Sequence, residues 1–130
     1  MDCVRGRIQG LAITFTEQAL SLYWRAEDHD GICRALLNLG DYYLESEEGE
    51  QAFACYREVM ELQSIAGNQS GLLSIYTSLV IAYFTYGMDE TAEDFIQATL
   101  MKVRHVKSPL TRANTYKDLA NILYRVGQNG

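Results

Sequence analysis

Proline is nearly absent from this 130-residue chain, in which Pro109 is the only one. Tracts rich in serine and glycine, or of other low complexity, are also missing. Disordered chains are rich in such residues and poor in apolar ones, whereas 48% of the residues here are hydrophobic. We therefore expect one folded domain, with disorder confined to its ends.

The chain also has no excess of basic residues and no paired cysteines. The net charge of −6 argues against a nucleic-acid partner, because such proteins carry a basic surface. Cys3, Cys33 and Cys55 form no CxxC pair, and the first residues contain no apolar signal segment. An odd number of cysteines without a leader indicates reduced thiols, so we expect a cytoplasmic protein.

The chain has no hydrophobic run long enough to span a membrane. Its most apolar stretch, Leu72 to Met88, is about 17 residues long and contains four serine or threonine residues, whereas a span needs about 20 mostly apolar residues. A helix packed between two neighbours would have the same pattern. We therefore expect no membrane insertion.

Motifs that carry chemistry are absent as well. His29 and His105 lie far apart in the sequence, and neither has a cysteine or acid at a recurring metal-ligand spacing. We interpret Asp28-His29-Asp30 as a helix-capping turn rather than a cation site. Since there is also no glycine-rich phosphate loop or nucleophile elbow, we expect no enzyme, no cofactor and no metal.

What the chain does contain is a repeat with a period of 40 residues. Leu39, Leu79 and Leu119 share one position of the repeat. The other matching sets are Leu36, Tyr76 and Tyr116; Gly40, Val80 and Ala120; Tyr43, Tyr83 and Leu123; Ala12, Ala52 and Ala92; and Gly87 and Gly127. A fixed period of this length is typical of a solenoid of stacked helix pairs, which usually presents a surface for partners.

The apolar spacing is helical throughout and shows no strand pattern. It predicts helices over about 8–25, 32–46, 50–66, 72–86, 90–104 and 109–126. Ser108 and Pro109 suit the first positions of the last helix, and Gly127 suits its end. The short turns between these segments favour antiparallel neighbours.

The repeated motif resembles the tetratricopeptide repeat (TPR) family. Its first copy reads Leu36-x-x-Leu39-Gly40-x-x-Tyr43, followed by Ala52-x-x-x-Tyr56. The period of 40 instead of 34, with Asn38-Leu39-Gly40, is similar to the mitotic-spindle Leu-Gly-Asn-repeat adaptors and the kinesin light chains. Glu47 stands where a glycine is expected at the first turn between helices. The resemblance implies an all-α fold, a right-handed TPR-like superhelix of about six antiparallel helices.

The phase of the repeat leaves a half-repeat at each end of a single domain over 1–130. An orphan B helix (8–25) precedes two complete repeats (32–66 and 72–104), and an orphan A helix (109–126) follows them. We expect either a fragment of a longer solenoid or ends that meet another copy, because leaving an apolar side chain exposed forgoes about 1.5–3 kcal/mol. The residues expected to mediate self-association are Leu119, Ile122, Leu123 and Val126.

The resemblance also implies that A helices line a concave groove for a peptide or helix of a partner. The predicted groove residues are Arg34, Asn38, Asp41, Ser74, Thr77, Ser78, Ile81, Lys117 and Asn121, and by the same register Leu37, Glu45, Thr85, Asn114 and Asp118. Asn38 is the leading candidate to bond a peptide backbone. The alternative is that these are simply solvated helix positions.

These observations predict a protein–protein interaction module, with a protein or peptide as its partner and no chemistry of its own. The alternative is a structural segment that forms a homo-oligomer through its terminal helices. Lys117 and Asn121 match one half of the clamp by which some family members hold a terminal carboxylate, but the other half would lie on a further repeat.

Overall fold

The computed structural model describes residues 2–129 and is all α-helical in that range. The elements, in chain order, are α1 (Asp2–Ala26), α2 (His29–Glu45), α3 (Gly49–Ala66), α4 (Gln69–Thr85), α5 (Asp89–Val103) and α6 (Pro109–Asn129). Six helices were predicted at approximately these places, although α1 begins six residues before the predicted start at 8. Every helix in the described range falls short of the length and apolar character that crossing a bilayer requires.

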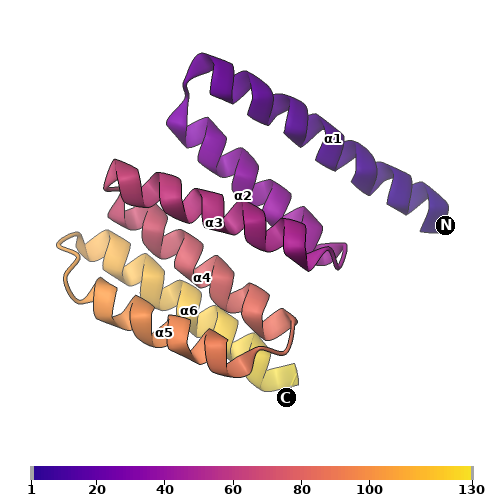
Figure 1. The fold of residues 1–130 in the computed structure, drawn as a ribbon. Coiled ribbons are helices and arrows are strands. Elements are labelled where there is room, and N and C mark those ends of the chain that lie inside the picture. Colours follow the sequence, from indigo (N-terminus) through magenta and orange to yellow (C-terminus); the bar gives the residue numbers. More distant parts are fainter. Residues whose placement is uncertain (1, 130) are drawn as a thin grey trace. The chain divides into compact units, whose positions relative to one another are not determined.

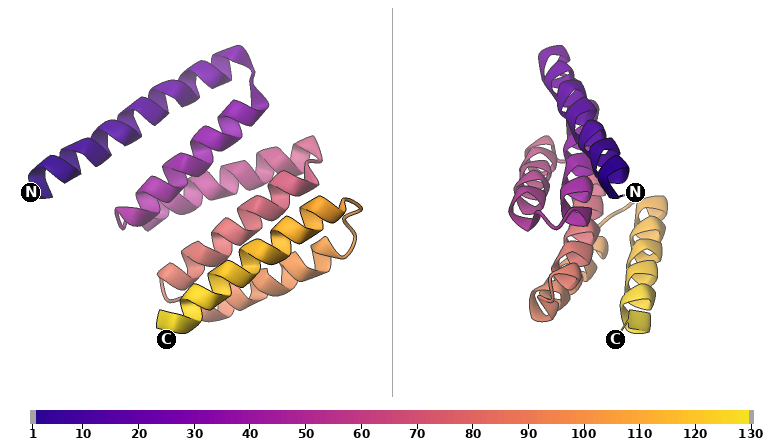
Figure 2. Two further views of the ribbon diagram at one scale, coloured as in Figure 1. Left: turned by 180° about the vertical axis from the view of Figure 1, so that it is seen from behind. Right: turned by 90° about the vertical axis from the view of Figure 1, so that its right-hand side faces the viewer.

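The chain divides into two compact units, Met1–Leu62 and Gln63–Gly130. In the first unit α1 packs against α2, and the two run antiparallel (Figure 1). In the second unit α4 contacts both α5 and α6, and Figure 2 shows α6 lying alongside the α4–α5 hairpin. Each unit is therefore built from sequential antiparallel helices, consistent with an array of helical hairpins.

Helix N-caps recur every 40 residues in the structure. The side chains of Asp28, Asn68 and Ser108 accept hydrogen bonds from the backbone N–H three residues on, at 3.1, 3.0 and 3.2 Å. Each bond satisfies one of the N–H groups that a helix start leaves without an intrahelical partner. The predicted Ser108 cap, with Pro109 as the first helical residue, is confirmed.

The helix ends follow the same spacing. Glu27 and Gly67 adopt positive φ values of 54° and 68°, and Glu47 and Gly87 adopt 61° and 72°. A left-handed residue just after a helix lets the chain turn sharply, so these four positions end α1, α3, α2 and α4. Gly127 is different, because α6 continues through it to Asn129 rather than ending there as expected.

Two glycines allow helices of the first unit to approach closely. A Cβ on Gly31 would lie 2.3 Å from the ring of Tyr23, and one on Gly40 would lie 2.6 Å from the ring of Tyr56. Tyr56 is fully buried, as is Ala52 one turn before it. The small residues of the repeat thus leave room for large ones on the neighbouring helix.

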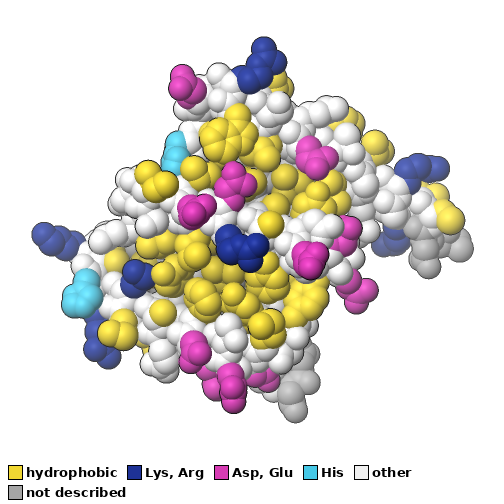
Figure 3. Space-filling model, viewed as in Figure 1, with side chains coloured by type: hydrophobic (Ala, Val, Ile, Leu, Met, Phe, Trp, Pro, Cys, Tyr) yellow, Lys and Arg dark blue, Asp and Glu magenta, His cyan; other side chains and the backbone are white. Residues whose placement is uncertain are grey.

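The second unit has its core between α4, α5 and α6. The leucine positions of the repeat, Leu79 and Leu119, are buried, as is Ala92 of α5. The ring of Phe95 contacts the ring of Tyr76 edge-on and stacks on the ring of Tyr83, with distances of 5.5 and 5.3 Å between ring centroids. These contacts join α5 to α4. Figure 3 shows hydrophobic side chains gathered over α4 and α5, with acidic side chains along the edge of α5.

Candidate functional site

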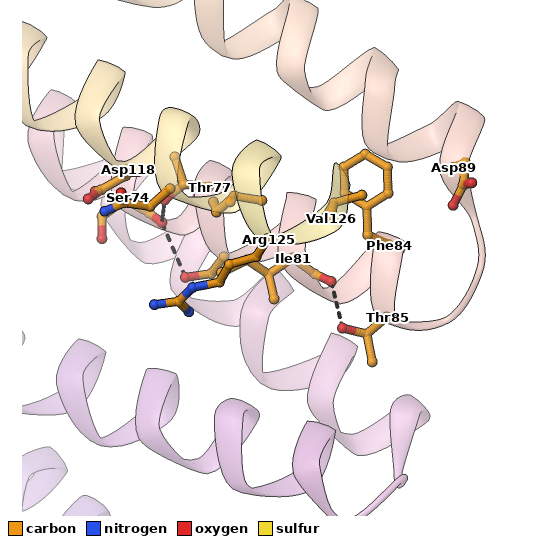
Figure 4. Close-up of a pocket in the computed structure, with 12 residues that line it drawn as sticks. Ser74, Thr77, Ile81, Phe84, Thr85, Asp89, Asp118, Arg125 and Val126 are labelled. Carbon is orange, nitrogen blue, oxygen red and sulfur yellow. Dashed lines mark hydrogen bonds between the residues drawn. The ribbon is translucent and has the colours of Figure 1, made fainter. Parts of the chain in front are cut away.

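The second unit contains an open cavity between α4 and α6, which we call the α4–α6 cavity. Its volume is about 630 Å³. Asn68 caps α4 and Ser108 caps α6, so both walls are helices with defined starts. The lining residues, all of which are drawn in Figure 4, are Ser74, Thr77, Ser78, Ile81, Phe84, Thr85, Asp89, Asp118, Asn121, Ile122, Arg125 and Val126.

On the α4 wall, three hydroxyl groups already donate their protons in hydrogen bonds within the helix. Thr77 and Ser78 both donate to the carbonyl of Ser74, at 2.8 and 3.3 Å, and Thr85 donates to the carbonyl of Ile81 at 2.8 Å. A hydroxyl oxygen that donates its proton keeps lone pairs that can accept. This wall therefore offers acceptors to a ligand that brings N–H groups, such as a peptide backbone.

The α6 wall carries the polar and charged groups. Asp118, Asn121 and Arg125 lie three and four residues apart, a spacing that places them on one face of the helix. The amide of Asn121 can both donate and accept, whereas Asp118 accepts and Arg125 donates. Asp89, in the first turn of α5, adds a second carboxylate to the lining.

Apolar side chains complete the lining. Ile81 is 42% exposed, and Phe84 and Val126 are partly exposed, whereas Ile122 is buried. An apolar surface of this kind, with a few polar groups placed around it, is the usual composition of a ligand-binding cleft. The cavity can therefore hold a segment with both backbone and apolar side-chain contacts.

The structure brings five of the predicted groove residues together at the α4–α6 cavity, namely Ser74, Thr77, Ser78, Ile81 and Asn121. Thr85 and Asp118 also line it, whereas the exposed Lys117 and Asn114 do not. Sequence reasoning missed Arg125 and Asp89. Arg125 could have been found from its spacing of four residues from Asn121, but Asp89 enters the lining only through the packing of α5.

The remaining predicted groove residues belong to α2 in the first unit. Asn38 and Arg34 are exposed, and Arg34 Nε donates to the carbonyl of Asp30 at 3.4 Å. Asp41 has a role within the fold, because its carboxylate accepts a hydrogen bond of 2.6 Å from the hydroxyl of Tyr56 in α3. These residues are not part of the α4–α6 cavity.

The Asp41–Tyr56 contact changes the acidity of both groups. Burial raises the pKa of Asp41 and the nearby charge of Glu45 raises it further, while the hydrogen bond from Tyr56 partly offsets these effects. Burial, together with the neighbouring Asp41 carboxylate, raises the pKa of Tyr56 well above its usual range.

The predicted self-association residues occupy three different environments in α6. Leu119 and Ile122 are 4% and 8% exposed and pack inside the second unit. Val126 lines the α4–α6 cavity, and only Leu123, at 43%, is substantially exposed. The sequence could not separate these environments, because all four residues fall on the apolar side of one helix.

Within the described part of the chain, the structure provides no candidate site for metal-ion or thiol chemistry. Among residues 2–129, no group of three or more His, Cys, Asp or Glu side chains could hold a metal ion. Cys3, Cys33 and Cys55 are free thiols, and burial raises the pKa of the latter two above the usual range.

Comparison with known proteins does not assign a family. Neither the family models nor the curated proteins compared with this chain match it.

Proposed function

We propose that this chain is a protein-interaction module that binds an extended peptide segment of a partner in the α4–α6 cavity. The observation that carries the proposal is the lining itself, which combines hydroxyl acceptors on α4, an amide and charges on α6, and exposed Ile81. A peptide matches this set because its backbone supplies N–H donors and its side chains supply apolar contacts. Binding would be an equilibrium process without catalysis or a cofactor.

We infer a TPR-like right-handed superhelix of the 40-residue type, in which α2, α4 and α6 are the A helices. Its support is the recurrence at 40 residues of the N-caps and of the positive-φ turns. A cytoplasmic location fits the three free thiols, and the net charge of −6 disfavours nucleic acid as the partner.

The direct test is selection of peptides from a random displayed library, followed by NMR titration of the enriched sequences. We expect amide shifts to concentrate on the lining residues of α4 and α6. Ser78→Ala should weaken binding by about fivefold, because one hydrogen bond contributes about 1 kcal/mol. Asn121→Ala should have a similar effect, since its amide is the one lining group on α6 that can both donate and accept.

Matched controls exist for both substitutions. Ser70 is exposed in the first turn of α4, and Asn114 is exposed on α6 two turns before Asn121; neither lines the cavity. Ser70→Ala and Asn114→Ala should therefore leave the affinity unchanged. Peptides whose shifts lie away from the cavity lining, or that bind the four variants equally, would refute the proposed site.

Self-association is the second candidate, and one observation favours it. At matching repeat positions, Leu36 of α2 is 3% exposed but Tyr116 of α6 is 45% exposed. Leu123 is likewise 43% exposed, and Tyr124 beside it is 70% exposed. We propose that a second copy covers this face of α6, through Tyr116, Leu123 and Tyr124 rather than through the buried Leu119 and Ile122.

A further inference from the structure

The charged residues of the α4–α6 cavity alternate in sign along it. Figure 4 shows Asp118 beside Ser74 and Thr77, Arg125 beside Ile81, and Asp89 beyond Phe84. Asp118 and Arg125 are seven residues apart on α6, which corresponds to about 10 Å along a helix that rises 1.5 Å per residue. A ligand in the cavity would therefore meet negative, positive and negative charge in turn.

These charges are available to a ligand. Among the residues that the structure describes, the side chains of Asp118, Arg125 and Asp89 make no hydrogen bond or ion pair. Arg125 and Asp89 are exposed and Asp118 is partly exposed, so each can be reached from solvent. Charges at the rim of a binding site contribute more to choosing a partner than to total affinity.

We propose that the cavity selects segments in which one acidic residue has a basic residue on each side of it. The basic residue that faces Asp118 lies three positions from the acidic residue. An extended chain rises about 3.1–3.3 Å per residue, so three residues cover about 10 Å, the spacing of Asp118 and Arg125 along α6. The acidic residue would pair with Arg125 and the flanking basic residues with Asp118 and Asp89. This inference rests on the proposed peptide-binding function.

Apolar residues next to the acidic one fit the same arrangement. Ile81, Phe84 and Val126 lie on the lining near Arg125, and all three are at least partly exposed. The backbone N–H groups of the ligand would donate to the hydroxyl oxygens of α4. The expected partner is thus an extended segment of alternating charge with apolar residues between the charges.

A capped peptide, Lys-Ser-Leu-Glu-Leu-Ser-Lys, is a suitable probe because its pattern reads the same in both chain directions. Its control, Glu-Ser-Leu-Lys-Leu-Ser-Lys, has the same composition and net charge, so attraction to the acidic protein as a whole is equal. We expect the first to bind about five- to tenfold more tightly in NMR titrations. High salt should reduce that difference, because it screens exposed charges.

Charge-reversal variants test the residues themselves. Arg125→Glu should remove the preference for the first peptide, while Arg112→Glu should keep it, because Arg112 is exposed on α6 outside the cavity. Both substitutions change the net charge equally. Amide shifts at residues far from the substitution verify that each variant remains folded.

The outcomes separate this inference from the proposed function. Equal affinity for the two peptides, with shifts at α4 and α6, would overturn the charge pattern and leave peptide binding intact. Library-selected ligands that lack an acidic residue between basic ones would also overturn it. If neither the two probes nor any library peptide shifts the cavity residues, the proposed function itself fails.

Discussion

Gly40 of α2 lies directly against the ring of Tyr56 in α3. A Cβ at Gly40 would come within 2.6 Å of ring atom Cε1, a distance that real Cβ contacts do not reach. Tyr56 cannot easily move aside, because it is fully buried and its hydroxyl is bonded to Asp41. The α2–α3 packing of the first unit therefore depends on a glycine at this position.

Gly40→Ala should destabilise the first unit by about 1–2 kcal/mol. Overpacking costs about 1–3 kcal/mol, and the better helix propensity of alanine returns only about 0.5–1 kcal/mol. Gly10→Ala is the matched control, since Gly10 is helical with nothing within 4 Å, and it should stabilise slightly. Urea unfolding of the two variants decides the point, and an equal response of both would contradict the packing argument.

Gly31 and Tyr23 provide a test of compensation between repeats. Gly31→Ala should be strongly destabilising, because its Cβ would meet the Tyr23 ring at 2.3 Å. Eighty residues later, Val103 matches Tyr23 and Thr111 matches Gly31. There, a smaller side chain at the first position accompanies a residue with a Cβ at the second. Tyr23→Val should therefore cost less in the Gly31→Ala background than in the wild type. A double-mutant cycle with no coupling would refute this.

Glu47 and Gly87 occupy equivalent turns and should respond in opposite directions. Glu47 has φ 61°, a conformation that costs a residue with a side chain about 1–2 kcal/mol. Glycine also has greater freedom in the unfolded chain, which offsets part of this gain. Glu47→Gly should therefore raise the free energy of unfolding by about 0.5–1 kcal/mol. Gly87→Ala, at φ 72° with open space around it, should destabilise by about 1 kcal/mol. Thermal unfolding can measure both, and a loss of stability in Glu47→Gly would count against this account.

Asp41 should make the stability of the first unit fall as pH rises. Its pKa is raised in the folded protein, so the folded state holds the proton more tightly than the unfolded chain. That contribution is fully present below the unfolded pKa of about 3.9 and is lost as pH rises through the folded pKa. The free energy of unfolding, measured against Asp41→Asn from acid to neutral pH, should therefore decline and then level off.

Tyr56→Phe extends the same experiment. The Tyr56 hydroxyl bond lowers the pKa of Asp41, so Tyr56→Phe should keep the ring, raise that pKa further and extend the decline to higher pH before it levels off. A decline that levels off at lower pH than in the wild type would show that the hydrogen bond does not stabilise the carboxylate. An increase of stability with pH, relative to Asp41→Asn, would contradict the direction assigned to Asp41.

Leu123→Lys tests whether the exposed face of α6 holds a second copy. If it does, the substitution should lower the average mass in sedimentation at high protein concentration, because a charge would be buried in the interface. Leu110→Lys is the control, since Leu110 is 70% exposed on the same helix but outside the repeat positions. A wild-type protein that is monomeric at every concentration would eliminate the self-association candidate.

The helices and their caps were predictable because they depend on neighbouring residues. Polar residues at 28, 68 and 108 cap helices whatever packs above them, and the 40-residue spacing was visible as a repeat. The helices α2 and α4 start three residues earlier than predicted, so that Gly31 and Gly71 are helical. Both lie inside the first turn of a helix, where they make room for Tyr23 and Gln63.

What the amino-acid sequence determined by itself was the number, type and approximate limits of the helices, since these follow from local hydrogen bonding and apolar spacing. Only the tertiary structure decided which side chains share an environment. It placed Asp89 of α5 with Arg125 of α6, buried Leu119 while leaving Leu123 exposed, and bonded Asp41 to Tyr56. These relationships depend on how helices rotate and approach each other, which a one-dimensional pattern does not specify.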